Sequence, residues 1–424
     1  MIAASCVDAP ADPPVDPPLN ASATFWPLES YTAQQRLVTT FWGKLSIDRS
    51  NKFGIGVYHD GASGGLPVAS QLPWALNLTG HGGRVLLYVA LLFSQNGNVS
   101  SCTGGCISTV RLSEGDNSSC SAGCVPPAQF VASLQQAYAM GLHPVVRLGQ
   151  WPRTIRDFSD DTEHLHYTSL AKIYRDFAAA LPLPPDGSPL EVIVHNELNT
   201  KGEWVCSGDG YASTNDTAAE VAGCLRDTMG ALRPLPRLLL SLAPTAYTAP
   251  AIYPCKANTS GVPSPVNYST PTDIEFMVQM RHTVPDLYGR ADFFNSHPYP
   301  WGDRPFSTKL GRAGVVHYRT QLEATGYPSL PVLISETGWK GHDEVDKAVS
   351  IVAALQEEWL PDARVASVMP FLLSSEDGSG FANSGWRWVL WPNSTIATPP
   401  SATQQYNATR ALRCKLHASS ACGP

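Results

Sequence analysis

Two glutamates, Glu197 and Glu336, stand where short apolar runs of the sequence end. The run "EVIVHNELNT" (191–200) reaches His-Asn-Glu, and "PVLISETGWK" (331–340) reaches Ser-Glu-Thr. Two neighbouring carboxyl groups can share one reaction, because one gives a proton to a leaving oxygen while the other, ionised, attacks or activates water. A single glutamate in such a place is usually an exposed edge residue. The prediction of a reactive site therefore depends on the pair, and on a fold that brings the two together.

The rest of the chain alternates short apolar runs with longer stretches of helical spacing. We expect eight strands, at 53–59, 84–92, 144–149, 192–197, 238–245, 292–299, 332–339 and 364–373. Helices are expected near 128–141, 165–181, 216–232, 272–289, 312–325, 343–359 and 401–417. The second of these carries Leu170, Ile173, Tyr174 and Phe177 at i, i+3, i+4, i+7 spacing. A helix between the first two strands is the weakest expectation.

Strands that are apolar on both faces and separated by helices predict the parallel sheet of an α/β protein. Eight such units close a (β/α)8 TIM barrel. The alternative is a doubly wound open sheet, but "VYHDGASGG" lacks the glycine spacing of its phosphate-binding turn. We predict a Pro/Asp-rich lead-in over 1–22 and a single barrel domain over 23–424. Long insertions at 93–127, 199–215 and 247–271 follow the carboxyl ends of strands, which form the active face of a barrel.

With these motifs the sequence resembles the clan A retaining glycoside hydrolases, barrel enzymes with an Asn-Glu acid/base at strand 4 and a glutamate nucleophile at strand 7. "HNELN" resembles the strand-4 motif, which implies that Glu197 is the acid/base and that Asn196 holds the sugar's 2-hydroxyl. "ISETGW" is most similar to the strand-7 motif of the β-1,3-glucanases and implies that Glu336 is the nucleophile. Leu198 stands where the relatives carry proline.

A third motif, "NSHPY" (295–299), resembles the strand-6 His-x-Tyr of the cellulase-like members. The resemblance implies that Tyr299 hydrogen-bonds the nucleophile and that His297 lies nearer the acid/base. A core His-Tyr pair bonded to the backbone would have the same sequence. Arg147, at the end of the third expected strand, is a candidate to bond the nucleophile or a sugar hydroxyl, with a structural salt bridge as the alternative.

Tryptophans are the expected sugar-stacking groups, since the C–H face of a sugar packs on an indole ring. Relatives commonly place one at the end of strand 8, where this sequence has "MPFLLSS". The following "GWRWVLW" offers Trp386, Trp388 and Trp391 as replacements. We name Trp391 and Trp339 as substrate-binding residues, although large aromatics are also common core fillers.

Charge argues against nucleic acid or membrane partners. The chain has 29 basic and 36 acidic residues, a formal net charge of −7, and no run of lysine or arginine that could neutralise successive phosphates. Nowhere do eighteen apolar residues run together. No cofactor or metal is expected, because metal-dependent barrel hydrolases begin with His-x-His on strand 1, where this chain has Tyr58-His59-Asp60.

Cysteines and sequons favour a secreted glycoprotein. Ten cysteines are present, and four of them, Cys102, Cys106, Cys120 and Cys124, form a cluster in the insertion at about 93–127. A disulfide set or a metal site could explain the cluster, and we predict disulfides because the C-x3-C spacing departs from the C-x2-C pairs of most zinc ribbons. We also predict local pairs between Cys414 and Cys422 and between Cys206 and Cys224. Nine Asn-X-Ser/Thr sequons point to N-glycosylation, at Asn20, Asn77, Asn98, Asn117, Asn215, Asn258, Asn267, Asn393 and Asn407. The N-terminus shows no signal peptide.

Together these features predict a retaining hydrolase of β-linked glycans, endo-acting and with a β-glucan-type substrate. The expected partner is a polysaccharide or oligosaccharide; nothing in the sequence specifies the oligomeric state. A transglycosylase on cell-wall glycan is the nearest alternative, since an acceptor sugar can replace water. A non-catalytic carbohydrate-binding barrel is the alternative from another class, but the paired glutamates count against it.

Overall fold

The structure is a computed structural model that describes residues 51–57, 68–91, 126, 128–150, 159–199, 204, 214–246, 273–374, 386–390 and 400–417. All eight predicted strands are present, each followed by at least one helix, so the α/β class is confirmed. The strands are β1 (Gly54–Val57), β2 (Arg84–Leu91), β3 (His143–Gln150), β4 (Leu190–Val194), β5 (Leu238–Ser241), β6 (Phe294–Ser296), β7 (Val332–Ile334) and β8 (Val365–Val368). The predicted lead-in at 1–22 lies outside the described residues.

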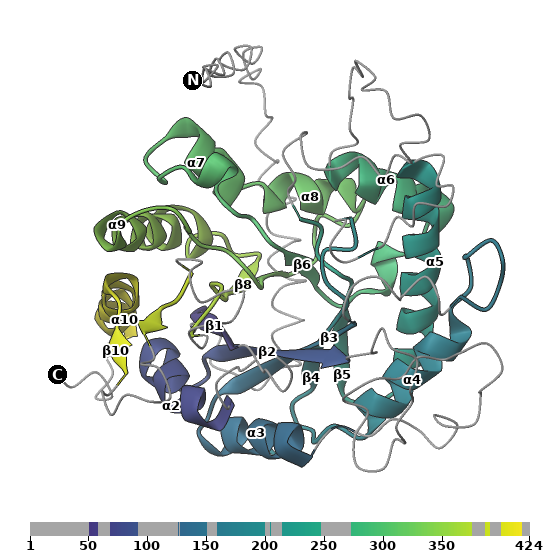
Figure 1. Ribbon diagram of the computed structural model, residues 1–424, viewed down its shortest axis with the longest axis horizontal. Coiled ribbons are helices and arrows are strands. Elements are labelled where there is room, and N and C mark those ends of the chain that lie inside the picture. The colour runs from purple at the N-terminus through teal and green to yellow at the C-terminus, as the bar shows by residue number, and fades with distance from the viewer. Residues whose placement is uncertain are drawn as a thin grey trace, which may run out of the picture.

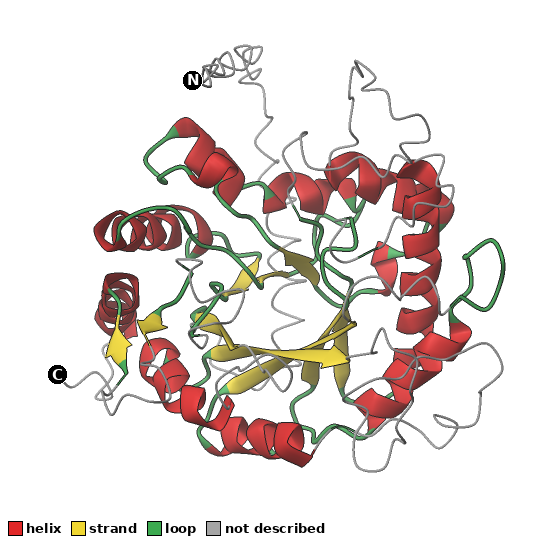
Figure 2. Cartoon of the chain, viewed as in Figure 1, coloured by secondary structure: helices red, strands yellow, loops and turns green. Residues whose placement is uncertain are grey.

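The helices lie around the strands, as Figures 1 and 2 show. They are α2 (Val68–Thr79), α3 (Ala128–Ala139), α4 (Thr168–Ala179), α5 (Thr214–Leu232), α6 (Asp273–Thr283), α7 (Lys309–Val315), α8 (Tyr318–Ala324), α9 (Glu344–Ala354) and α10 (Gln404–His417). The expected helix at 312–325 is therefore two short helices, α7 and α8. The weakest expectation, between β1 and β2, is met by α2, which contains Pro73. Proline is read from sequence as a helix breaker, which explains the weak signal.

The eight strands form two parallel sheets in chain order. One sheet has the order β1-β2-β3-β4-β5 and the other β6-β7-β8. Further hydrogen bonds join their outer strands. Gly56 of β1 donates its N–H to the Pro370 carbonyl and accepts from the Leu373 N–H, and the Asp292 N–H before β6 donates to Leu240 of β5. Short parallel strands in consecutive order place all their carboxyl ends at one face.

Apolar residues fill both faces of the strands. On β4, Val192 and Val194 pack in a cluster shared with the helices, whereas Ile193 belongs to a second cluster lined by the strands. Six members of this second cluster come from six different strands, namely Leu86, Val145, Ile193, Leu239, Leu333 and Ala366. Burial on both sides explains why the strands have continuous apolar sequences rather than alternating ones.

A buried polar layer lies next to the strand-lined cluster, towards the amino ends of the strands. Arg84 of β2 makes a bidentate ion pair with Glu191 of β4, at 2.8 and 3.1 Å, and also donates to the Ala366 carbonyl of β8. Both side chains are fully buried. Burial opposes ionisation of Glu191, but the Arg84 guanidinium holds the pKa of this carboxyl below its usual value. The pair thus links three strands across the interior.

The cysteine predictions have different outcomes. Cys224 has a free, buried thiol, so the predicted pair with Cys206 is wrong. Its sulfur lies on the face of α5 that packs against the end of β4, 3.7 Å from the His195 ring. Cys414 is disulfide-bonded, while its predicted partner Cys422 and the cluster at 102–124 lie outside the described residues.

Among the nine sequons, Asn77 on α2 and Asn407 on α10 have described side chains, and both are exposed. No helix among the described residues has the length and apolar character that a membrane crossing requires.

Candidate active site

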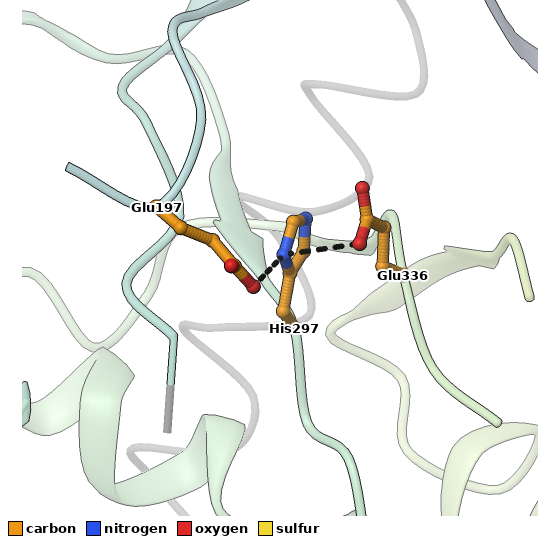
Figure 3. A group of neighbouring side chains, drawn as sticks. All are labelled: Glu197, His297 and Glu336. Carbon is orange, nitrogen blue, oxygen red and sulfur yellow. Dashed lines mark hydrogen bonds and ion pairs between the residues drawn. The ribbon is translucent and has the colours of Figure 1, made fainter. Parts of the chain in front are cut away.

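The two predicted glutamates come together at the carboxyl ends of the strands. Glu197 follows β4 and Glu336 follows β7. Figure 3 shows the ring of His297 between them. One carboxylate oxygen of each glutamate and the Nδ1 atom of His297 all lie within 4.8 Å of one another. In the described part of the chain, this is the group of side chains with the geometry to hold a metal ion.

Glu336 is held by two donors from different strands. Arg147 of β3 donates from Nη1 to Oε1 at 2.7 Å. The Tyr299 hydroxyl, from the segment after β6, donates to Oε2 at 3.0 Å. A cation and a hydroxyl donor both interact favourably with a negative charge on Glu336. The carboxylate is almost enclosed, with 9% of its side chain exposed.

Glu197 has a different environment. His297 Nδ1 lies 2.7 Å from Glu197 Oε1 and 3.6 Å from Glu336 Oε2. The other ring nitrogen of His297, Nε2, lies 3.0 Å from the Ser335 hydroxyl, so both nitrogens of this fully buried ring face polar partners. The Glu197 side chain is 21% exposed and is therefore the more accessible of the two carboxylates.

Asn196 also joins the cluster. Its side-chain oxygen accepts a hydrogen bond of 2.6 Å from Arg147 Nη1, the same nitrogen that contacts Glu336. A single guanidinium nitrogen thus links the residue before Glu197 to Glu336 across the mouth of the strands. Of the six predicted substrate-binding residues, Asn196, His297, Tyr299 and Arg147 lie beside the glutamates.

The side-chain direction at the end of β4 depends on His195. Ile193 points into the strand-lined cluster, so regular alternation would direct His195 the same way. Instead its backbone has φ 65°, and its ring contacts Tyr174 of α4 and Cys224 of α5. The reversal gives Asn196 the inward direction, toward Arg147. Burial lowers the pKa of His195 to about 3, so this ring is neutral in the folded protein.

A buried network fixes β6 below His297. The Ser296 hydroxyl donates to the Gln321 side chain of α8 at 2.6 Å, and Gln321 in turn donates to Asp273 of α6 at 2.7 Å. The same carboxylate oxygen of Asp273 lies 2.8 Å from His317 Nε2. Because these four side chains are buried and bonded in sequence, the strand that carries His297 is tied to two helices.

The tryptophan predictions require correction. Trp339 is 2% exposed, packs in the core shared with the helices and donates its indole N–H to the Arg304 carbonyl, so its ring has no free face for a sugar. Trp388 is buried as well, and Trp391 lies outside the described residues. Trp386 is partly exposed, and its ring centroid lies 5.2 Å from that of Tyr299 in an edge-to-face contact. Among the described tryptophans, Trp386 therefore contacts Tyr299, the residue that donates a hydrogen bond to Glu336.

Comparison with known proteins gives the fold. No family model and no curated protein matches the sequence. Among solved structures, β-glucosidase 2 from the fungus Trichoderma reesei matches with a TM-score of 0.52 and 12% identity, over 88% of this chain and 100% of that one. The catalytic domain of the GH26 endo-β-1,4-mannanase from Bacillus sp. JAMB-750 matches with a TM-score of 0.51 and 14% identity, over 89% and 90%. The chain therefore has the fold of the clan A glycoside hydrolases.

Proposed function

We propose that the protein is a retaining glycoside hydrolase that cleaves β-linked glycans at the mouth of a closed (β/α)8 barrel. The observation that carries the proposal is the pair Glu197 and Glu336, at the ends of β4 and β7 with one oxygen of each within 4.8 Å. Carboxyl groups in retaining enzymes stand about 5 to 5.5 Å apart, whereas inverting enzymes leave about 6.5 to 9.5 Å for a water. The separation favours a covalent intermediate.

Closure of the barrel is supported at both edges of the two sheets. Phe53, just before β1, forms a parallel bridge with Val368 of β8, and Ala246, after β5, forms one with His297, after β6. These bridges at both edges support closure of the two sheets into one barrel. The long insertions predicted on the active face lie mostly outside the described residues.

The two glutamates take different roles because their surroundings differ. Arg147 and Tyr299 both stabilise the charge of Glu336, which suits the nucleophile. Among the described residues Glu197 contacts His297, and its side chain is more exposed than that of Glu336, which suits a group that exchanges a proton with substrate and water. Asn196, oriented by Arg147, is expected to hold the 2-hydroxyl of the sugar.

The reaction then proceeds in two displacements. A carboxylate oxygen of Glu336 forms a bond to the anomeric carbon as the glycosidic C–O bond breaks, and Glu197 gives its proton to the leaving oxygen. In the second step Glu197 takes a proton from water, whose oxygen displaces Glu336 and releases the sugar. Glu197 ends protonated, ready for the next cycle.

The substrate is expected to be a β-glucan-type polymer cut internally. The two structural relatives named above are a β-glucosidase and an endo-β-1,4-mannanase, which supports the β-linkage. Trp386 beside Tyr299 offers an indole for one sugar ring. Exposure of Asn77 and Asn407 is compatible with N-glycosylation and secretion, which a mobility shift after enzymatic deglycosylation of the native protein would test.

The decisive experiment measures new reducing ends from β-1,3-, β-1,4- and mixed-linkage glucans, mannan, xylan and galactan. Wild type is compared with Glu336→Gln and with Glu323→Gln, a control on α8 away from the site. Activity on one polymer that falls by at least about 10³-fold in Glu336→Gln alone supports the proposal. Activity retained in Glu336→Gln would refute the assignment, and sugar transfer without net hydrolysis would identify a transglycosylase.

A further inference from the structure

The three side chains at the proposed catalytic centre are also arranged as metal ligands. His297 Nδ1 lies 2.7 Å from Glu197 Oε1 and 3.6 Å from Glu336 Oε2, with all three ligand atoms within 4.8 Å of one another. Figure 3 shows both carboxylates directed at the same nitrogen. Ligand atoms around a tetrahedral zinc ion with bonds of about 2.0 to 2.2 Å stand roughly 3.4 Å apart. Small shifts of the flexible glutamate side chains would reach this geometry.

The charges around the three atoms favour a cation. Arg147 contacts Glu336 through Oε1, while Glu336 Oε2 accepts the Tyr299 hydroxyl and also lies 3.6 Å from His297 Nδ1, so two carboxylates stand beside the Arg147 guanidinium. His297 is fully buried and Glu336 nearly so, hence little water screens the two acids from each other. A divalent cation between the Glu197 and Glu336 carboxylates would attract both and offset their mutual repulsion.

The donor set and the outer contacts indicate which ion would bind. One imidazole with two carboxylates suits Zn²⁺ or a neighbouring transition-metal ion, rather than Mg²⁺ or Ca²⁺, which prefer oxygen alone. A metal-bound histidine usually donates its other N–H to an acceptor, and Ser335 Oγ stands 3.0 Å from His297 Nε2. In that tautomer the Nδ1 lone pair points between the glutamates.

We propose that this cluster is a reversible Zn²⁺ site that blocks the proposed glycosidase. The ion coordinates His297 Nδ1 and one carboxylate oxygen from each of Glu197 and Glu336. Bound zinc occupies both the acid/base and the nucleophile, so it excludes substrate. Inhibition rests on the proposed function, whereas zinc binding itself does not.

Binding is tested on the full chain after dialysis against a chelator, by equilibrium dialysis and calorimetry with ZnCl₂. Wild type is compared with His297→Gln and with the matched control His166→Gln, whose side chain is 57% exposed and remote from the glutamates in sequence. We expect His297→Gln to bind one equivalent less than wild type and His166→Gln to bind as much as wild type. If His297→Gln fails to fold, Glu197→Gln, at the more exposed ligand, is expected to lose the same equivalent.

Inhibition by zinc is measured with the glycan that the protein cleaves. Zinc should raise KM without changing kcat, and a chelator should restore the original KM. Equal zinc binding by wild type, His297→Gln and Glu197→Gln, or no saturable binding by wild type, would overturn the site. A protein that binds zinc at this cluster but cleaves no glycan would keep the metal site and refute the glycosidase, so the two failures are distinguishable.

Discussion

His195 and Asn196 are neighbours in the chain, yet their side chains leave the end of β4 in opposite directions. The His195 ring lies among the helices, against Tyr174 and Cys224, while the Asn196 amide reaches Arg147 at the mouth. The turn between them depends on φ 65° at His195, a left-handed value that β-branched residues strongly resist. The backbone at His195 therefore sets the direction of Asn196 and Glu197.

His195→Val and His195→Asn test whether the left-handed backbone at His195 positions the site. Valine resists the left-handed backbone, so we expect a loss of stability of about 1–3 kcal/mol and a fall in kcat of roughly 10- to 100-fold. Asparagine tolerates positive φ and should retain more of the kcat. Arg237→Val supplies the control, because Arg237 has φ 61° just before β5, remote from the glutamates. Equal kcat in Val and Asn variants, measured at matched folded fractions, would contradict the positioning role.

The reversed side-chain direction at His195 could not be predicted from the sequence, whereas the strands could. All eight strands followed from apolar runs, because strands buried on both faces leave a continuous hydrophobic signal. The carboxylate pair followed from two such runs that end on glutamate. A single left-handed residue leaves no periodic signal, and histidine is not a residue that marks positive φ as glycine does.

The sequence alone also could not show which tryptophans pack in the core and which lie at the site. Trp339 and Trp386 both follow strand ends, but the first packs under the helices and the second lies beside Tyr299. A large aromatic in a predicted loop fits either place, since the same apolar ring serves the core and a sugar. Three-dimensional packing alone separates the two.

Tyr299→Phe tests the second donor to Glu336. The variant removes the 3.0 Å hydrogen bond but keeps the ring that contacts Trp386. A hydrogen bond to a charged group contributes about 1.5–3 kcal/mol, so we expect kcat/KM to fall roughly 10- to 100-fold. Tyr406→Phe, which loses a hydroxyl bonded to the Trp74 carbonyl, is the control and should keep its activity. An unchanged kcat/KM in Tyr299→Phe would show that this hydroxyl does not contribute to the reaction.

The paired variants Trp386→Ala and Trp388→Ala distinguish a binding indole from a core indole. Trp386 is partly exposed beside Tyr299, so its loss should raise KM while the melting temperature changes little. Trp388 is 1% exposed, and its loss should cost about 3–5 kcal/mol of unfolding free energy. Kinetics on the preferred glycan and denaturant unfolding of both proteins check this. An unchanged KM in Trp386→Ala, or a raised KM without loss of stability in Trp388→Ala, would show that the sugar does not stack on Trp386.

Removing Arg84 alone is expected to lower the unfolding free energy more than removing Arg84 and Glu191 together. Arg84→Met leaves an unpaired carboxylate in the interior and should cost about 3–5 kcal/mol. The double variant Arg84→Met, Glu191→Leu removes both charges and should recover most of this loss, because the desolvation cost disappears with them. Urea unfolding of wild type, Arg84→Met, Glu191→Leu and the double variant gives the coupling energy between the two sites. A double variant as unstable as the single one would show that packing, not charge, dominates there.

Acid stability should depend on His143, which lies in the same buried layer. Burial lowers its pKa to about 4, opposed by the charge of Glu191, from an ordinary value near 6.5. Between these values the unfolded chain binds the proton and the folded protein does not, so stability falls as pH decreases from about 6.5 to about 4. The slope approaches about 1.4 kcal/mol per pH unit for one such group. In His143→Gln the unfolding free energy should change less with pH over this window. A variant that keeps the wild-type pH dependence would show that other groups cause the acid sensitivity. His195, whose pKa is also lowered by burial, would then be tested next.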